Sequence, residues 1–236
     1  MQVKKLCSFY PWLILSLIVG LVFYSEHIYL KLHLGKTYSP LTLNDQSPSF
    51  AVDETIFYAT KTRAILNHHW FLGDPQIWEY QYKASPHLGE WLPAVILAGL
   101  SRLGGSLANG FMMADFVGPA VNFLVISLWL FYQTKQKAWA MVGGLTMMVL
   151  TYYLKYLPFV PSMIKIVIAG LTQGSFSPFI RSFHPQLTFP VLMLFLISAW
   201  KQRWWLSGIL AGVLAYCHFF YFSFAVVFLA ITSLQA

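Results

Sequence analysis

Charged residues are scarce in this sequence. Only 10% of its 236 residues are Asp, Glu, Lys or Arg, whereas 58% are hydrophobic, and the mean hydropathy is +0.61. Soluble domains carry roughly 25% charged residues, so this composition excludes an ordinary soluble protein and predicts a polytopic membrane protein. Cysteine is also rare. Cys7 and Cys217 form no CxxC pair, which excludes a disulfide framework and a cysteine metal site.

The positive charge of the chain does not indicate a nucleic-acid partner. The formal net charge is +7, but the basic residues occur singly or in small groups between apolar runs. This distribution is typical of the charge that flanks membrane spans. We therefore expect membrane lipids, and no nucleic acid, among the partners.

The first apolar run, 12–24, follows two lysines, a pattern that signal peptides and membrane anchors share. No small-x-small cleavage site follows the run, and polar residues beginning with Glu26 come instead. We therefore expect an uncleaved first span over 12–29. Because positive charge stays inside, its N-terminus is predicted to be cytoplasmic, and residues 31–90 form a large outer loop.

The remaining apolar runs predict an all-α fold, a polytopic transmembrane helix bundle of about seven spans. They are 91–107, 111–131, 138–154, 158–171, 187–200 and 204–234. We expect a single transmembrane domain over 1–236, with the remaining helices in 91–236. The last run reaches Ala236 without a basic residue or polar tail, so we expect an N-terminal portion of a longer protein.

Seven spans conflict with the positive-inside rule, because they leave Lys135 and Lys137 outside. Two runs, 91–107 and 158–171, are near or below the minimum of about 17 residues for a span. If both are interfacial or re-entrant, the count is about five and both lysines fall inside. In either arrangement the loop 173–186 faces the same side as the first outer loop.

The acidic residues are concentrated in the predicted outer loop. The chain has no acid after Asp115. Those in the loop are Asp45, Asp53, Glu54, Asp74, Glu79 and Glu90. A loop that is merely solvated also carries charge, so only their arrangement favours a functional interpretation.

Asp53 and Glu54 are adjacent and begin a segment of helical composition that continues to Leu66. Its apolar residues, among them Ala59, are expected to rest on the bilayer surface as an amphipathic juxtamembrane helix. Carboxylates in a first helical turn are stabilised by the helix dipole. The alternatives are a general base or a ligand for a divalent cation such as Mg²⁺ or Mn²⁺.

The next part of the loop contains a turn at Asp74 and a further acid, Glu79. His68 and His69 precede them, either as metal ligands or, more commonly for such pairs, as interfacial side chains. Several aromatic residues accompany them and form either an interfacial belt or a platform for sugar rings. They are Trp70, Trp78, Tyr80, Tyr82 and Trp91.

The second outer segment carries Arg181 and His184 among aromatic residues. A guanidinium is a planar fork that suits bidentate contacts with phosphate. The alternative for Arg181 is an interfacial anchor before an apolar run. Chemistry alone assigns no role to His184.

Several of these segments, in this order, carry a resemblance to a known family. They are "DETIFYATKTRAIL", "GDP" with a following glutamate, "EWLPAVILAGLSRLGG" and "ADFVGPAVNFLV". The later segments "RSFHPQLTFPVLML" and "WWLSGILAGVLAYCHFFY" add to it. Together they cover most of the chain and resemble bacterial and archaeal membrane glycosyltransferases of the GT-C superfamily.

The resemblance implies transfer of a sugar from a polyprenyl-phosphate or polyprenyl-diphosphate donor to an acceptor on the outer face of the bacterial plasma membrane, in the cell envelope. It implies that Asp53, with Glu54 as partner, is the catalytic base or a metal ligand. It further implies a second acidic group at Asp74 and Glu79. The sequence departs from the family by lacking the soluble C-terminal domain or later spans of other members.

The resemblance also predicts contacts for the donor phosphate or the substrate, from Arg181, His184, Asp74 and Glu79. Two other classes remain alternatives to a transferase. A transporter or lipid flippase would place ionisable groups within its spans. The candidates for this are Asp115, Lys165 and His218, which are scattered along the sequence. The third class is a non-catalytic membrane scaffold.

Overall fold

The computed structural model describes residues 10–38, 58–70, 91–150 and 186–234. Within these ranges every regular element is a helix and no strand occurs, which confirms the all-α prediction for this part of the chain. The chain divides into two compact units. One comprises 1–38 with 115–182, the other 39–114 with 183–236.

The first unit is built on two long helices, α2 (Tyr10–Leu34) and α5 (Leu107–Thr134), of which α5 contributes its residues from Asp115 onward. A 3₁₀ turn, η1 (Gly35–Thr37), follows α2. By length and composition, α2 and α5 are the described helices of at least 18 residues that can cross a membrane. At 1.5 Å per residue, their 25 and 28 residues extend about 37 and 42 Å.

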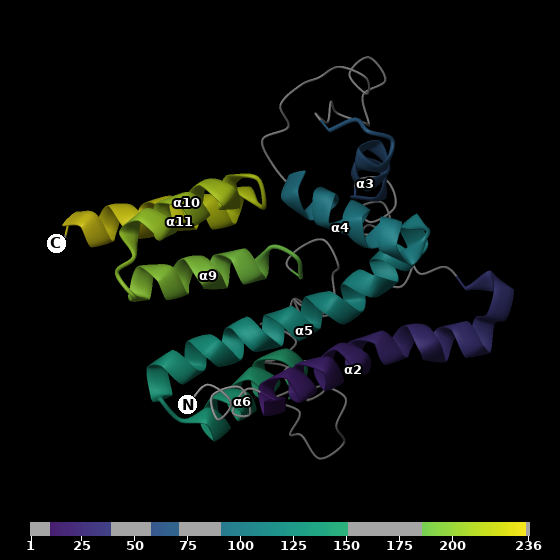
Figure 1. Cartoon of the computed structure of the whole chain (residues 1–236), viewed down its shortest axis with the longest axis horizontal. Coiled ribbons are helices and arrows are strands. Elements are labelled where there is room, and N and C mark those ends of the chain that lie inside the picture. Colours follow the sequence, from purple (N-terminus) through teal and green to yellow (C-terminus); the bar gives the residue numbers. More distant parts are fainter. Residues whose placement is uncertain (1–9, 39–57, 71–90, 151–185, 235–236) are drawn as a thin grey trace, which may run out of the picture. The chain divides into compact units, whose positions relative to one another are not determined.

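Small residues let α2 and α5 approach closely (Figure 1). The Ser16 hydroxyl donates a 2.8 Å hydrogen bond to the Ala120 carbonyl, and a Cβ added at Gly20 would lie 2.7 Å from the carbonyl oxygen of Phe116. Residue numbers rise along α2 as they fall along α5, so the helices are antiparallel. Packing through small residues is typical of helices within membranes.

The opposite face of α2 is apolar and exposed. Only 22% of its most apolar window is buried, against 61% for α5. The exposed large side chains of α2 include Leu13, Ile14, Leu17, Ile18, Leu21, Ile28 and Leu32. A water-soluble helix usually buries such side chains, whereas a helix in lipid presents them outward.

The second long helix is followed at once by α6 (Lys137–Leu145), which continues as a π-helical turn, η4 (Thr146–Leu150). Glycine again sets the distance between neighbours. A Cβ at Gly144 would lie 2.1 Å from the hydroxyl of Ser127, and one at Gly143 would lie 2.7 Å from Leu130. A larger side chain at Gly143 would require the Leu130 side chain to move, and one at Gly144 would require Ser127 and Phe123 to move.

The second unit includes α3 (Ala59–Leu66) and α4 (Trp91–Gly104). Ala59 and Ile65 of α3 are buried in a core with Leu97 of α4 and Phe111. The prediction that Ala59 rests on a bilayer surface is therefore wrong. One face of this eight-residue helix packs against protein, because its alanine and isoleucine fit the small side chains of α4.

Three shorter apolar helices complete this unit: α9 (Phe189–Trp200), α10 (Trp204–Ala215) and α11 (Phe219–Leu234). The single apolar run predicted over 204–234 is divided by a turn at 216–218. Buried hydroxyls of Ser198 and Ser207 join α9 to α10 by a 2.8 Å hydrogen bond. The amide of Leu92 donates to the carbonyl of Tyr216 at 3.0 Å, which ties α4 to the turn.

Several helices end on a non-glycine residue in the left-handed conformation. His68, Lys135 and Gln202 have φ values of 65°, 57° and 53°. At the end of α9, the amide of Arg203 donates to the Ser198 carbonyl and that of Gln202 to the Ala199 carbonyl, each at 2.9 Å. This is the Schellman pattern, in which glycine is the residue usually found.

Candidate functional site: a half-buried tyrosine with a buried histidine and aspartate

An imidazole and a carboxylate are buried between the two long helices of the first unit. His27 on α2 and Asp115 on α5 have side chains that are only 3% and 8% exposed. Nε2 of His27 lies 2.7 Å from Oδ2 of Asp115. The pairing satisfies two groups that would each be costly to bury alone.

The sequence of α2 explains why His27 points toward α5. The buried residues of this helix are Trp12, Ser16, Val19, Gly20 and His27. Ser16 and His27 are separated by three turns of 3.6 residues, so they lie on one stripe. The stripe that carries the close contacts of Ser16 and Gly20 with α5 therefore also carries the imidazole. Antiparallel packing then brings His27 opposite the beginning of α5, where Asp115 lies.

A proline adds to the polarity of this region of α5. Pro119 lies inside the helix, four residues after Asp115. Proline has no N–H, so the helical hydrogen bond to the backbone carbonyl of Asp115 is not formed. The backbone carbonyl of Asp115 therefore needs a hydrogen-bond donor other than the amide four residues later. Its carboxylate also needs a donor, which His27 supplies.

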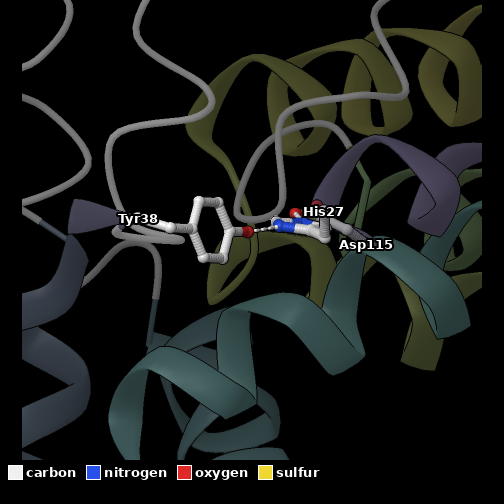
Figure 2. Close-up of polar contacts among 3 residues, drawn as sticks. All are labelled: His27, Tyr38 and Asp115. Carbon is white, nitrogen blue, oxygen red and sulfur yellow. Dashed lines mark hydrogen bonds and ion pairs between the residues drawn. The ribbon is translucent and has the colours of Figure 1, made fainter. Parts of the chain in front are cut away.

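Tyr38 completes the cluster from just beyond the 3₁₀ turn (Figure 2). Its hydroxyl makes a short hydrogen bond with Nδ1 of His27, and the two rings meet edge to face at 6.2 Å. A carboxylate only accepts, so Nε2 of His27 donates to Asp115. Nδ1 then accepts from the tyrosine hydroxyl, and each group donates to the next in the order Tyr38, His27, Asp115.

The electrostatics of the cluster keep this hydrogen on Tyr38. Burial raises the pKa of the Tyr38 hydroxyl well above its usual value, and the negative charges of Asp115 and Glu26 raise it further. The phenol is therefore neutral throughout the physiological range. Tyr38 is suited to donating a hydrogen bond and to fixing the chain at this point, and is unsuited to acting as a phenolate nucleophile.

The arrangement has the parts of a hydrogen-bonded relay. An aspartate that orients an imidazole, which in turn bonds a hydroxyl, is the geometry that serves proton transfer in catalytic triads. Here the imidazole is buried between two helices and its two nitrogens are both engaged by protein groups. The cluster can therefore hold Tyr38 in place, or pass a proton if Tyr38 moves away.

The residues assigned by the sequence lie elsewhere. Asp53, Glu54, Asp74, Glu79, Arg181 and His184 are all outside the described residues. Among the residues that are described, no group of three or more His, Cys, Asp or Glu side chains is placed to hold a metal ion. The divalent cation expected at Asp53 and Glu54 remains a prediction.

Part of the aromatic and histidine-rich stretch is described. His68 and His69 are exposed and form the left-handed turn that ends α3. The indole nitrogen of Trp91 donates to the carbonyl of Trp70 at 2.9 Å. Two of the predicted aromatic residues are thus brought together, and the bond links the segment after α3 to the first residue of α4.

Sequence reasoning missed His27 and Tyr38 as site residues. The polar residues that include His27 were noted only as a reason to reject a cleavage site, and Asp115 was treated as a scattered charge. One sequence signal was available. Each of the two long apolar runs contains at least one ionisable residue within its span, and ionisable residues inside membrane helices usually pair with one another. Tyr38 carries no comparable signal.

Comparison with known proteins adds no further assignment. The chain matches no protein-family model, no curated protein and no solved structure.

Proposed function

We propose that the chain is an integral membrane glycosyltransferase of the GT-C type. It would transfer a sugar from a polyprenyl-phosphate or polyprenyl-diphosphate donor to an acceptor on the outer face of a bacterial plasma membrane. The observation that carries the proposal is the contrast between the two ends of the α2–α5 pair. One end holds the cluster of Tyr38, His27 and Asp115, and the other is followed by Lys135 and Lys137.

Membrane insertion is supported by helix length and by the exposed apolar face of α2. Because α2 and α5 are antiparallel, α5 ends on the side where α2 begins. Lys135 and Lys137 then share that side with the N-terminus, which is cytoplasmic by the positive-inside rule. These features favour about five spans over seven.

The polar cluster then belongs to the outer end of the helix pair. The segment 39–57 with Asp53 and Glu54 continues directly from Tyr38, the residue that His27 holds. A lipid-linked donor presents its phosphate at this membrane face. Transfer needs a carboxylate to take a proton from the acceptor, the role proposed for Asp53, and positive charge to stabilise the leaving phosphate, the role proposed for Arg181. Mg²⁺ or Mn²⁺ would serve the same purpose.

The direct test measures transfer of radiolabelled sugar from polyprenyl-phosphate donors in membranes that express the full-length gene. The Asp53→Asn variant keeps the shape of the side chain and removes its charge. The matched control is Asp45→Asn, an acid of the same loop without an assigned role. We expect transfer to fall at least about 100-fold in the first variant and to persist in the second. Equal transfer by Asp53→Asn at normal abundance contradicts the proposal.

One observation favours a second candidate, proton-linked transport. A buried His–Asp pair inside two long apolar helices is the kind of group that carries protons in membrane transporters. Purified protein in proteoliposomes with an internal pH dye distinguishes the two. Proton movement that a substrate triggers and that His27→Gln abolishes supports transport. Sugar transfer without proton movement supports the transferase.

A further inference from the structure

The turn between α9 and α10 forms a basic and aromatic projection of the second unit. Lys201, Gln202 and Arg203 are all exposed. The tryptophans on either side, Trp200, Trp204 and Trp205, are exposed by 65%, 47% and 70%. The Schellman bonds at Gln202 and the buried Ser198–Ser207 hydrogen bond hold the turn in one conformation. Basic and tryptophan side chains together are typical of a membrane–water interface.

A groove of about 450 Å³ opens directly beside this turn. It is lined by Trp204 of α10 and by Leu229, Ala230, Thr232 and Ser233 of α11. The hydroxyl of Thr232 donates to the Phe228 carbonyl at 2.9 Å, and that of Ser233 to the Ala230 carbonyl at 2.8 Å. Because both hydroxyls are satisfied by their own helix, the groove presents a surface that accepts hydrocarbon.

The charge around the groove has one sign. The described residues of this unit contain no Asp or Glu, and the sequence has none anywhere after Asp115. Arg203 directly precedes the groove residue Trp204, and Lys201 lies in the same turn. A planar guanidinium and an ammonium in one rigid turn are suited to a phosphate group.

We propose that this groove is a binding site for an anionic phospholipid of the cytoplasmic leaflet. The phosphate lies at Lys201 and Arg203, and an acyl chain lies along the groove between α10 and α11. The site does not depend on glycosyl transfer. It requires that the chain is embedded in a membrane with this basic turn on the cytoplasmic side, as the positive-inside rule predicts.

The experiment measures lipid retention by native mass spectrometry of the full chain released from nanodiscs that contain equal phosphatidylglycerol and phosphatidylcholine. The test variant is the double substitution Lys201→Gln with Arg203→Gln. Each basic residue near an anionic lipid contributes roughly fivefold in affinity, so we expect about a 25-fold weaker retention of phosphatidylglycerol. The matched control, Lys135→Gln with Lys137→Gln, removes the same charge from the other turn and should retain the lipid.

Two further variants separate the parts of the site. Arg203→Lys keeps the charge and should retain phosphatidylglycerol, which guards against loss through misfolding. Ala230→Trp fills the groove from an exposed position and should reduce retention while leaving both cations in place. Glycerol phosphate, a headgroup without acyl chains, should not compete.

The proposal is overturned by equal losses in the two double variants, which would show a general surface field. Unchanged retention in the Lys201 and Arg203 variant overturns it as well. Unchanged retention in Ala230→Trp, with the protein still folded, shows that the groove holds no acyl chain and also refutes the site.

Discussion

The α2–α5 pair and the α9–α10 hairpin are both pairs of apolar helices packed side by side, but they are joined by different polar groups. Both are antiparallel and both use buried serines, Ser16 in the first and Ser198 with Ser207 in the second. Only the α2–α5 pair also buries an ionisable pair, His27 with Asp115. In the hairpin, a hydroxyl bond and apolar side chains such as Phe195 and Leu214 join the two helices without an ionisable pair.

The difference teaches that the ionisable pair is not required to hold helices together. Burying a carboxylate and an imidazole costs desolvation energy that an apolar contact avoids. A fold that needed only packing would have used serine, alanine or glycine at both positions. We therefore interpret the cluster at His27 as serving the chemistry of the chain, and the hydroxyl pair of the hairpin as structural.

The largest expected effect comes from breaking the buried ionisable pair. Asp115→Ala leaves the imidazole of His27 without its acceptor and should cost about 3 kcal/mol in the free energy of unfolding. The measurement is denaturation in mixed micelles by circular dichroism. A double-mutant cycle with His27→Ala should give a coupling energy of at least about 1 kcal/mol. Additive losses would show that the two side chains do not interact.

The next largest loss of stability is expected where the backbones of α2 and α5 approach closely, at Gly20. Gly20→Val places a side chain against the Phe116 carbonyl, which lies 2.7 Å from a Cβ at this position. We expect a loss of about 2–3 kcal/mol, measured by the same unfolding assay. Gly212 on α10 is the control, because a Cβ there meets no atom within 4 Å. Gly212→Ala should be neutral or stabilising by up to about 1 kcal/mol. Equal behaviour of the two would contradict the packing.

The hydroxyl bond of the hairpin should contribute less. Ser198→Ala removes the bond to Ser207, and we expect a loss of about 1 kcal/mol in unfolding free energy with no effect on sugar transfer. Ser233→Ala is the control, because that exposed hydroxyl bonds only a carbonyl of its own helix. A loss as large as that of Asp115→Ala would remove the contrast between the two helix pairs.

A substitution in the turn of the hairpin should raise the free energy of unfolding by a similar amount. Gln202 pays the penalty of a side chain in the left-handed conformation at φ 53°. Gln202→Gly should raise the free energy of unfolding by about 1 kcal/mol, whereas Gln202→Ala, which keeps a Cβ, should not. A gain from alanine equal to that from glycine would argue against this backbone strain.

The smallest effect concerns pH. The folded chain raises the pKa of Tyr38 above the unfolded value near 10, so folding favours the neutral phenol. Its contribution is complete below about pH 10 and declines as pH rises above that value, because only the unfolded chain then ionises freely. Unfolding midpoints between pH 8 and pH 11 should fall more steeply for the wild type than for Tyr38→Phe. Parallel curves would contradict the half-buried hydrogen bond between Tyr38 and His27.

Composition was sufficient to predict the all-helical structure of the described residues, because long apolar runs leave few alternatives to helix. It was also sufficient to place the two long helices α2 and α5, which were expected as spans over 12–29 and 111–131. The turn that separates α10 from α11 was not predicted, since the residues at 216–218 include no proline or glycine. The burial of Ala59 was missed because an amphipathic helix packs equally well, from sequence alone, on protein or on lipid.

The residues of the candidate site also differ in how far the sequence predicts them. Asp115 was noted because an acid in an apolar run is rare, but its partner depends on the antiparallel packing of α2 against α5. Helical periodicity places His27 on the stripe with Ser16 and Gly20, whereas nothing in the sequence places Tyr38 beside it. Contacts across such distances arise from tertiary packing, which local patterns do not encode.

The most direct test of the central claim is the rate of sugar transfer by Asp115→Asn, compared with Ser198→Ala at equal amounts of folded protein. The substitution keeps the shape of Asp115 and removes the charge that orients His27. If the cluster positions the chain that leads to Asp53, Asp115→Asn lowers kcat at least about tenfold while Ser198→Ala transfers at the wild-type rate. Equal rates for the two variants would contradict the account, because the buried ionisable pair would then be as purely structural as the hydroxyl pair.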